Sequence, residues 1–264
     1  MTNEATVSAF QSSTAQPGIR KIQFSDLIDV LMKGLDDFNA KPSHIVLLVV
    51  IYPLLALIAA RIAAGYDMLP LVFPLLSGFA LIGPVAALGV YELSRRRELG
   101  LDIGWEHALR VVYAPSFRAI LALSLILGAI YFAWLFSALA IHWLIFGSLV
   151  PTSIEDFILQ ILTTPKGWTL IIVGCGVGFI FAVVVLAISA VSFPMLLDRN
   201  VGVMTAIQTS VRVFLANPAT MLMWGAIVAG SLVLGSLPLF VGLAVVMPVL
   251  GHATWHLYRK AVAT

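Results

Sequence analysis

The stretch "LPLVFPLLSGFALIGPVAALGVY", residues 69–91, decides the fold class, because it contains no Asp, Glu, Lys or Arg. An apolar run of about 20 residues is long enough to cross the hydrocarbon core of a bilayer as one helix. The whole chain agrees with this local pattern, since 61% of its residues are hydrophobic and 11% are charged, and its mean hydropathy is +1.03. Such values lie outside the range of soluble domains and predict an all-α membrane protein.

Further apolar runs of this kind predict a polytopic bundle of six transmembrane helices. They lie at 43–60, 69–91, 119–146, 169–194, 219–237 and 239–257, and the turn-forming sequence Gly235-Ser236-Leu237-Pro238 separates the last two. Basic residues prefer the cytoplasmic side of short loops. If the N-terminus is cytoplasmic, every Lys and Arg lies on that side except Arg61 and Lys166. We therefore expect both termini in the cytoplasm.

The segment before the first run has two parts. Residues 1–22 are polar and rich in Ser and Thr, which predicts a disordered cytoplasmic tail. Residues 23–41 contain "FSDLIDVLMKGLDDF", in which apolar residues recur at helical spacing and acidic residues lie elsewhere. This pattern predicts an amphipathic helix on the membrane surface, or alternatively a helix that docks on a partner. Residues 42–264 then form the transmembrane domain.

Two segments between the spans are similar to each other. "RELGLDIGWEHALRVVYA" at 97–114 aligns without gaps with "RNVGVMTAIQTSVRVFLA" at 199–216, and the aligned identities include three pairs: Arg97 with Arg199, Gly100 with Gly202, and Arg110 with Arg212. Each segment follows an outward-to-inward span and precedes an inward-to-outward one. The pattern predicts a parallel internal repeat with units at about 69–148 and 167–237.

Four motifs resemble a known family. They are "DDFNAKPSH" at 36–44, "IYPLLAL" at 51–57, "LPLVFPLLSGFALIGPVAALGVYELSRRRELG" at 69–100 and "SFPMLLDRNVGVMTAIQTS" at 192–210. Through them, nearly the whole chain is similar to the uncharacterised bacterial integral membrane proteins grouped as domain-of-unknown-function family 2189. The resemblance implies a multi-pass protein of the bacterial inner membrane and implies no activity. Some relatives are labelled as similar to cytochrome c oxidase subunit I, but this chain has only 5 histidines, too few for a haem–copper core.

Three histidines are candidate ligands for zinc, copper or haem. His252 and His256 lie on one face of the last predicted helix, and His44 is expected at the same depth at the start of the first. The alternative is that these imidazoles form hydrogen bonds at the membrane interface. No Gly-rich phosphate loop, GxSxG elbow or HExxH helix occurs in the chain, so the motifs predict no cofactor.

The second predicted span contains a candidate broken-helix site at Pro70, Pro74, Gly83 and Pro84. Proline removes a backbone donor and kinks a helix, and discontinuous helices form many transporter sites. Close packing is the alternative.

Immediately after this span, Arg95, Arg96 and Arg97 form a basic cluster. The cluster predicts contact with anionic lipid on the cytoplasmic side, or with an acidic partner protein.

These features leave three functional hypotheses. The absence of ionisable residues near the middle of the spans and of catalytic motifs favours a non-catalytic accessory, scaffold or assembly component of a larger membrane complex. The label of some relatives makes respiratory complexes the first partners to examine. The second hypothesis is a transporter or channel for a neutral or lipophilic solute, and the third is a metal- or haem-binding membrane protein. An enzyme is less expected, and the formal charge of +2 gives no reason to expect a nucleic-acid partner.

Overall fold

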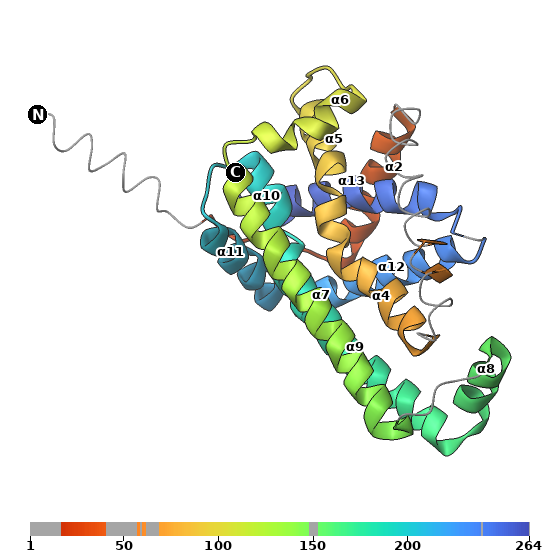
Figure 1. Cartoon of the computed structure of the whole chain (residues 1–264). Coiled ribbons are helices and arrows are strands. Elements are labelled where there is room, and N and C mark those ends of the chain that lie inside the picture. The colour runs from red at the N-terminus through yellow and green to blue at the C-terminus, as the bar shows by residue number, and fades with distance from the viewer. Residues whose placement is uncertain are drawn as a thin grey trace, which may run out of the picture.

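The structure is a computed structural model that describes residues 17–40, 57–58, 60–61, 69–147, 153–238 and 240–263. Within these ranges the chain is helical apart from turns, short connections and an isolated antiparallel bridge between Ile19 and Val262. The helices (Figure 1) are α2 Phe24–Ala40, α4 Leu69–Ala86, α5 Leu88–Glu98, α6 Trp105–Ala108, η1 Leu109–Tyr113, α7 Phe117–Phe146, α8 Ile154–Thr163, α9 Pro165–Ser189, α10 Ser192–Asp198, α11 Val203–Ala216, α12 Pro218–Ser236 and α13 Leu243–Ala261. The predicted all-α class is confirmed.

Helical segments in the described part of the chain are long and apolar enough to cross a membrane at four places. These segments are Leu69–Glu98, which joins α4 and α5, Phe117–Phe146, Pro165–Asp198, which joins α9 and α10, and Pro218–Ser236. They correspond to the predicted runs at 69–91, 119–146, 169–194 and 219–237.

The other two predicted spans differ from these four. The run at 43–60 lies almost entirely outside the described residues. The run at 239–257 corresponds to α13, which is not among the four candidate spans. The C-terminal half of α13 carries polar side chains and is buried among other helices of the chain, with Trp255 and Tyr258 almost fully enclosed.

Two of the long segments are interrupted near one end. Ala87 separates α4 from α5, although the hydrogen bonds from Ala87 N to Gly83 O and from Tyr91 N to Ala87 O continue the helical pattern. Ala190 and Val191 separate α9 from α10. The second interruption has a local cause, because Pro194 has no N–H to donate to the carbonyl four residues earlier, that of Ala190.

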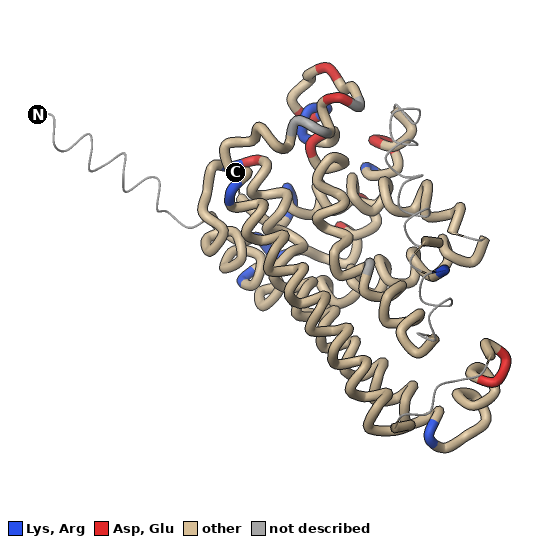
Figure 2. Tube along the Cα trace, viewed as in Figure 1, with Lys and Arg blue, Asp and Glu red and all other residues tan. Residues whose placement is uncertain are grey.

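The helices divide the molecule into an extended arm and a helical cluster. In Figure 1, α7 and α9 run side by side and carry α8 at their far end, whereas α5, α6, α10, α11 and the C-terminus lie at the opposite end. Aromatic packing joins the two arm helices, since the rings of Trp134 and Phe181 are 5.8 Å apart. In Figure 2, charged residues lie at the two ends and are absent from the long middle part of α7 and α9.

Helix α2 lies antiparallel along α13. Its Leu27, Val30 and Gly34 are buried, and a Cβ atom added at Gly34 would lie 2.6 Å from the carbonyl oxygen of Val249 on α13. Only glycine therefore permits this close approach. A second apolar stripe of α2 stays exposed, at Phe24, Ile28, Met32 and Leu35. The helix thus uses one face for packing on α13, and its position on a membrane surface remains a prediction.

Candidate functional site

A buried polar cluster joins α2, α5 and α13. Its centre is the carboxylate of Asp37, whose side chain is only 8% exposed. Asp37 Oδ2 lies 2.6 Å from Ser94 Oγ and 2.9 Å from His256 Nε2, and Asp37 Oδ1 accepts a hydrogen bond from the Arg97 guanidinium. His252 completes the set, because its Nδ1 lies 2.6 Å from Ser94 Oγ. We call these five residues the Asp37 cluster.

The hydrogen bonds of the cluster fix the positions of its protons. Burial would raise the pKa of Asp37, but hydrogen bonds from His256 and Ser94, with the electrostatic effect of the histidines, hold it below its usual value. The carboxylate is therefore ionised and accepts the Ser94 proton. Because a hydroxyl has one proton to donate, His252 Nδ1–H must donate to Ser94 Oγ. In this arrangement the Nε2 atom of His252 is an acceptor, and it is buried without a hydrogen-bond partner among the residues that the structure describes.

The three candidate metal or haem ligands have different environments. His44 lies outside the described residues. His252 and His256 share a face of α13 as predicted, but both turn toward Asp37, with His252 Nδ1 3.6 Å and His256 Nε2 2.9 Å from the same carboxylate oxygen. The sequence did not identify Asp37 or Ser94 as members of this set. Carboxylate and hydroxyl partners fit these imidazoles as hydrogen-bonded groups that hold three helices together.

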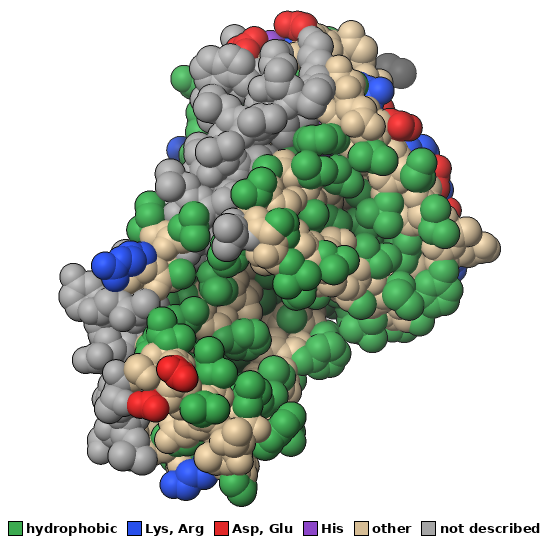
Figure 3. All heavy atoms as spheres, turned by 90° about the vertical axis from the view of Figure 1, so that its right-hand side faces the viewer, with side chains coloured by type: hydrophobic (Ala, Val, Ile, Leu, Met, Phe, Trp, Pro, Cys, Tyr) green, Lys and Arg blue, Asp and Glu red, His purple; other side chains and the backbone are tan. Residues whose placement is uncertain are grey.

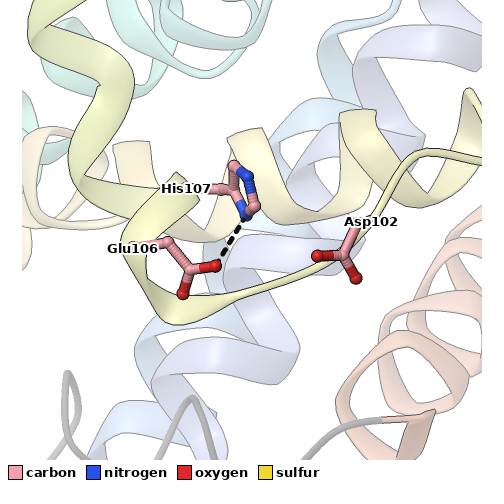
Figure 4. A group of neighbouring side chains, drawn as sticks. All are labelled: Asp102, Glu106 and His107. Atoms are coloured by element: carbon pink, nitrogen blue, oxygen red, sulfur yellow. Dashed lines mark ion pairs between the residues drawn. The ribbon is translucent and has the colours of Figure 1, made fainter.

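A different group within the described ranges brings three possible metal-ligand atoms within 4.8 Å of one another: Asp102, Glu106 and His107 (Figure 4). His107 Nδ1 lies 3.4 Å from a Glu106 carboxylate oxygen and accepts a hydrogen bond from the backbone N–H of Gly104 at 3.1 Å. The two carboxylates are exposed. Because the Nδ1 lone pair is already used by the backbone, the arrangement stabilises the turn that precedes α6.

The three consecutive arginines bind within the chain. Arg95 donates to Glu92 through Nε at 2.8 Å and Nη2 at 3.1 Å. Arg96 Nε donates to the carbonyl oxygen of Asp102 at 2.8 Å, and Arg97 pairs with Asp37. Each guanidinium thus has an intramolecular partner, and the predicted contact with lipid or a partner protein remains a proposal.

More ion pairs at the same end link α13 to its neighbours. Lys260 lies 2.7 Å from Asp26 and 2.9 Å from Asp29 on α2, and these hydrogen bonds raise the pKa of Lys260. Arg259 pairs with Glu98 at 2.8 Å and with Asp198 at 3.3 Å. The sequence suggested no partner for Asp26 and Asp29 of α2, and in the structure Lys260 of α13 pairs with both.

The residues of the candidate broken-helix site all lie on α4. On one side this helix is packed closely against α7, because Trp134 Nε1 donates to the Pro74 carbonyl at 3.0 Å and a Cβ at Gly78 would lie 2.4 Å from the Tyr131 ring. Among the described residues, no atom lies within 4 Å of a Cβ built at Gly83. Pro70, Pro74 and Pro84 occur within α4, and the interruption at Ala87 follows Pro84 by less than one turn.

The residues of the proposed repeat take different local conformations. In the first copy, Gly100 has a positive φ of 67° and Arg110 lies in η1. In the second copy, Gly202 precedes α11 with φ −73°, and Arg212 lies within that single helix. Arg97 and Arg199 also differ, since Arg97 lies within the last turn of α5 and Arg199 follows α10.

Comparison with known proteins gives one family. Residues 72–198 match the family described as "Predicted integral membrane protein (DUF2189)", which confirms the resemblance over this range; the motifs at 36–44 and 51–57 lie outside the match. No curated protein and no solved structure matches the chain significantly.

Proposed function

We propose that this integral membrane protein of family DUF2189 is a non-catalytic accessory or scaffold component of a larger complex in a bacterial inner membrane. The observation that carries the proposal is the exposure of α9. Only 6% of its most apolar stretch is buried within the chain, compared with 22–24% for the other three candidate spans. A helix so weakly covered by its own chain has a large surface for another membrane protein.

The exposed surface of α9 has the features of a helix-packing site. Gly176 is exposed, and no described atom lies within 4 Å of a Cβ built at this position. The exposed Ile172, Phe179 and Ile180 lie three or four residues from it, on the same face of the helix. Small residues let helix backbones approach closely in membranes, where the packing gained drives association. Figure 3 shows how broadly hydrophobic side chains cover one face of the molecule. Lipid covers such a surface equally well, so this glycine is the feature that favours a partner helix.

The Asp37 cluster and the neighbouring ion pairs support a structural role. They connect α2, α5, α10 and α13 through side chains whose hydrogen bonds are made within the protein. Groups that cross-link helices in this way stabilise a rigid platform at one end of the membrane domain. A rigid platform suits a subunit that positions other proteins.

The proposed topology has six spans, with the segment at 43–60 and α13 added to the four apolar segments, and both termini in the cytoplasm. The internal repeat belongs to the same proposal. It is supported by the order of elements in the two units. In each unit a long helix, α4 or α9, is interrupted and continues as a short helix, α5 or α10, and a second long helix begins later, at Phe117 or Pro218. The interruptions at Ala87 and at Ala190–Val191 lie at nearly equivalent positions.

Co-purification tests the proposal. The tagged chain is expressed at native level, extracted in mild detergent and analysed by quantitative mass spectrometry, beside the Gly176→Leu variant. Gly230→Leu is the matched control, because a Cβ at Gly230 also meets no described atom within 4 Å but lies on α12. We expect a near-stoichiometric partner with the wild type and the control, and its loss from the Gly176→Leu variant. A chain recovered alone from native membranes would overturn the proposal.

A second candidate is passage of a neutral or lipophilic solute along α4, favoured by the open space at Gly83 beside Pro84. Flux through proteoliposomes that is unchanged by Gly83→Leu and Pro84→Ala would remove this candidate. Metal or haem binding at His44, His252 and His256 is the third. Stoichiometric metal or a Soret band after gentle purification would support it.

A further inference from the structure

A cavity of about 480 Å³ lies where the two proposed repeat units meet. Its walls come from the end of α5, from the segment between η1 and α7, and from the end of α10 with the residues after it. Ser116 Oγ donates to the Arg199 carbonyl at 3.0 Å and joins two of these walls. The volume is within the range of about 300–1,000 Å³ that is usual for ligand sites.

Arginine side chains from opposite walls line this cavity. Arg95 uses Nε and Nη2 to bind Glu92, and Arg199 uses Nη2 to bind the Ala263 carbonyl at 2.7 Å. A guanidinium has five N–H donors, so these bonds orient each group and leave other donors for a ligand. Oriented guanidinium groups with unused donors are well suited to binding phosphate oxygens.

The charges around the cavity also favour an anion. Glu92 lies near Arg95 and, at 3.9 Å, near Arg96. Asp198 lies 3.7 Å from Arg199 and 3.3 Å from Arg259, and Arg259 is shared with Glu98. The lining itself holds two arginines and two carboxylates, but each of these carboxylates has a second guanidinium beside it, from Arg96 or Arg259, which do not line the cavity. A phosphate that entered the cavity would therefore meet carboxylates that are each already paired with two guanidinium groups.

The residues at the mouth indicate the source of the phosphate. Tyr113 lines the cavity but is 84% exposed, and the neighbouring Val112 is also exposed. Exposed aromatic and aliphatic side chains beside a polar cavity are typical of the headgroup level of a membrane. We propose that this cavity binds the phosphate of an anionic phospholipid headgroup, with Arg95 and Arg199 as its ligands.

Lipid binding by the purified full-length chain tests the proposal. After delipidation, binding of phosphatidylglycerol and of phosphatidylcholine is measured by native mass spectrometry at a series of lipid concentrations. Two variants alter the cavity: Ala114→Phe fills it without changing any charge, and Glu92→Gln/Arg95→Gln removes one buried ion pair as a unit. Arg20→Gln is the control, because Arg20 is exposed and does not line the cavity.

The wild type and Arg20→Gln should prefer phosphatidylglycerol, and both cavity variants should bind it about tenfold more weakly. Equal binding of phosphatidylglycerol by the wild type and the Ala114→Phe variant would overturn the proposal. A third arm uses glycerol 3-phosphate and inorganic phosphate without lipid. If these bind through Arg95 while lipid binding is insensitive to both variants, the cavity is a site for a soluble phosphate and the lipid assignment is wrong. The test does not depend on the accessory role, because it needs no partner protein.

Discussion

The hydroxyl of Ser94 lies 2.6 Å from the carboxylate of Asp37, although the two residues are 57 positions apart in the sequence. This contact places the last turns of α2 against α5 and lets one carboxylate organise two histidines of α13. The membrane-embedded helices gain little from the hydrophobic effect once they are in lipid. Polar contacts of this kind therefore have a large share in holding the end of the domain together.

Replacement of Asp37 by Asn should destabilise the protein by about 3 kcal/mol, because it breaks a buried charged network. The measurement is thermal unfolding in detergent, followed by tryptophan fluorescence. Asp36→Asn is the matched control, since Asp36 is the adjacent carboxylate and is exposed. Its effect should stay within about 0.5 kcal/mol. Equal losses in the two variants would contradict the central position of Asp37.

The contribution of Asp37 should depend on pH. Its pKa is below the ordinary value of 3.8 in the folded protein, so the unfolded chain takes up the proton first as the pH falls. The stabilisation is therefore complete above the unfolded value and is lost as the pH falls through the lowered folded value. We expect the difference in stability between the wild type and Asp37→Asn to be large at neutral pH and to shrink as the pH falls below the ordinary value of 3.8 and through the lowered folded value. A difference that stays constant with pH would exclude this explanation.

Ser94 and His252 should be energetically coupled. Ser94→Ala leaves the buried His252 Nδ1–H without its acceptor and should cost about 1–3 kcal/mol. His252→Leu removes that donor together with the unpartnered Nε2 atom. In a double-mutant cycle the combined loss should be smaller than the sum of the single losses by about 1 kcal/mol. Ser137 is a half-buried serine whose hydroxyl bonds to the carbonyl of Ala133 in its own helix, so Ser137→Ala provides the additive reference with His252→Leu.

Gly34→Ala should separate α2 from α13. The added methyl would lie 2.6 Å from the Val249 carbonyl oxygen and 2.8 Å from the Ala253 nitrogen, so backbone would have to move. We expect a loss of about 1–3 kcal/mol, measured by thermal unfolding, and faster hydrogen exchange in α2. Gly176→Ala, where the methyl meets open space, should cause no such loss. Unchanged protection of α2 in the Gly34 variant would contradict the observed packing.

The candidate site could be predicted only in part. Helical spacing correctly placed His252 and His256 on one face, but their common partner Asp37 is 219 positions from His256. In the sequence, Asp37 is one of several acids of an amphipathic helix, and nothing local distinguishes it from the exposed Asp36. The arginines at 95–97 were identified as a basic cluster, but their partners come from α2, from α5 itself and from the turn before α6.

The sequence by itself determined that this is an all-α integral membrane protein and where its four long apolar helices lie. A long uncharged run is the only local signal needed to predict a membrane-spanning helix. In lipid the backbone must satisfy its own hydrogen bonds, and a helix does so within one segment. The tertiary structure decided how the charged ends are used: which acid of α2 is buried beside Arg97, which other acids of α2 pair with Lys260 of α13, and where two arginines face one cavity. These choices depend on helices that are distant in sequence and meet only after packing, so no local pattern of residues contains them.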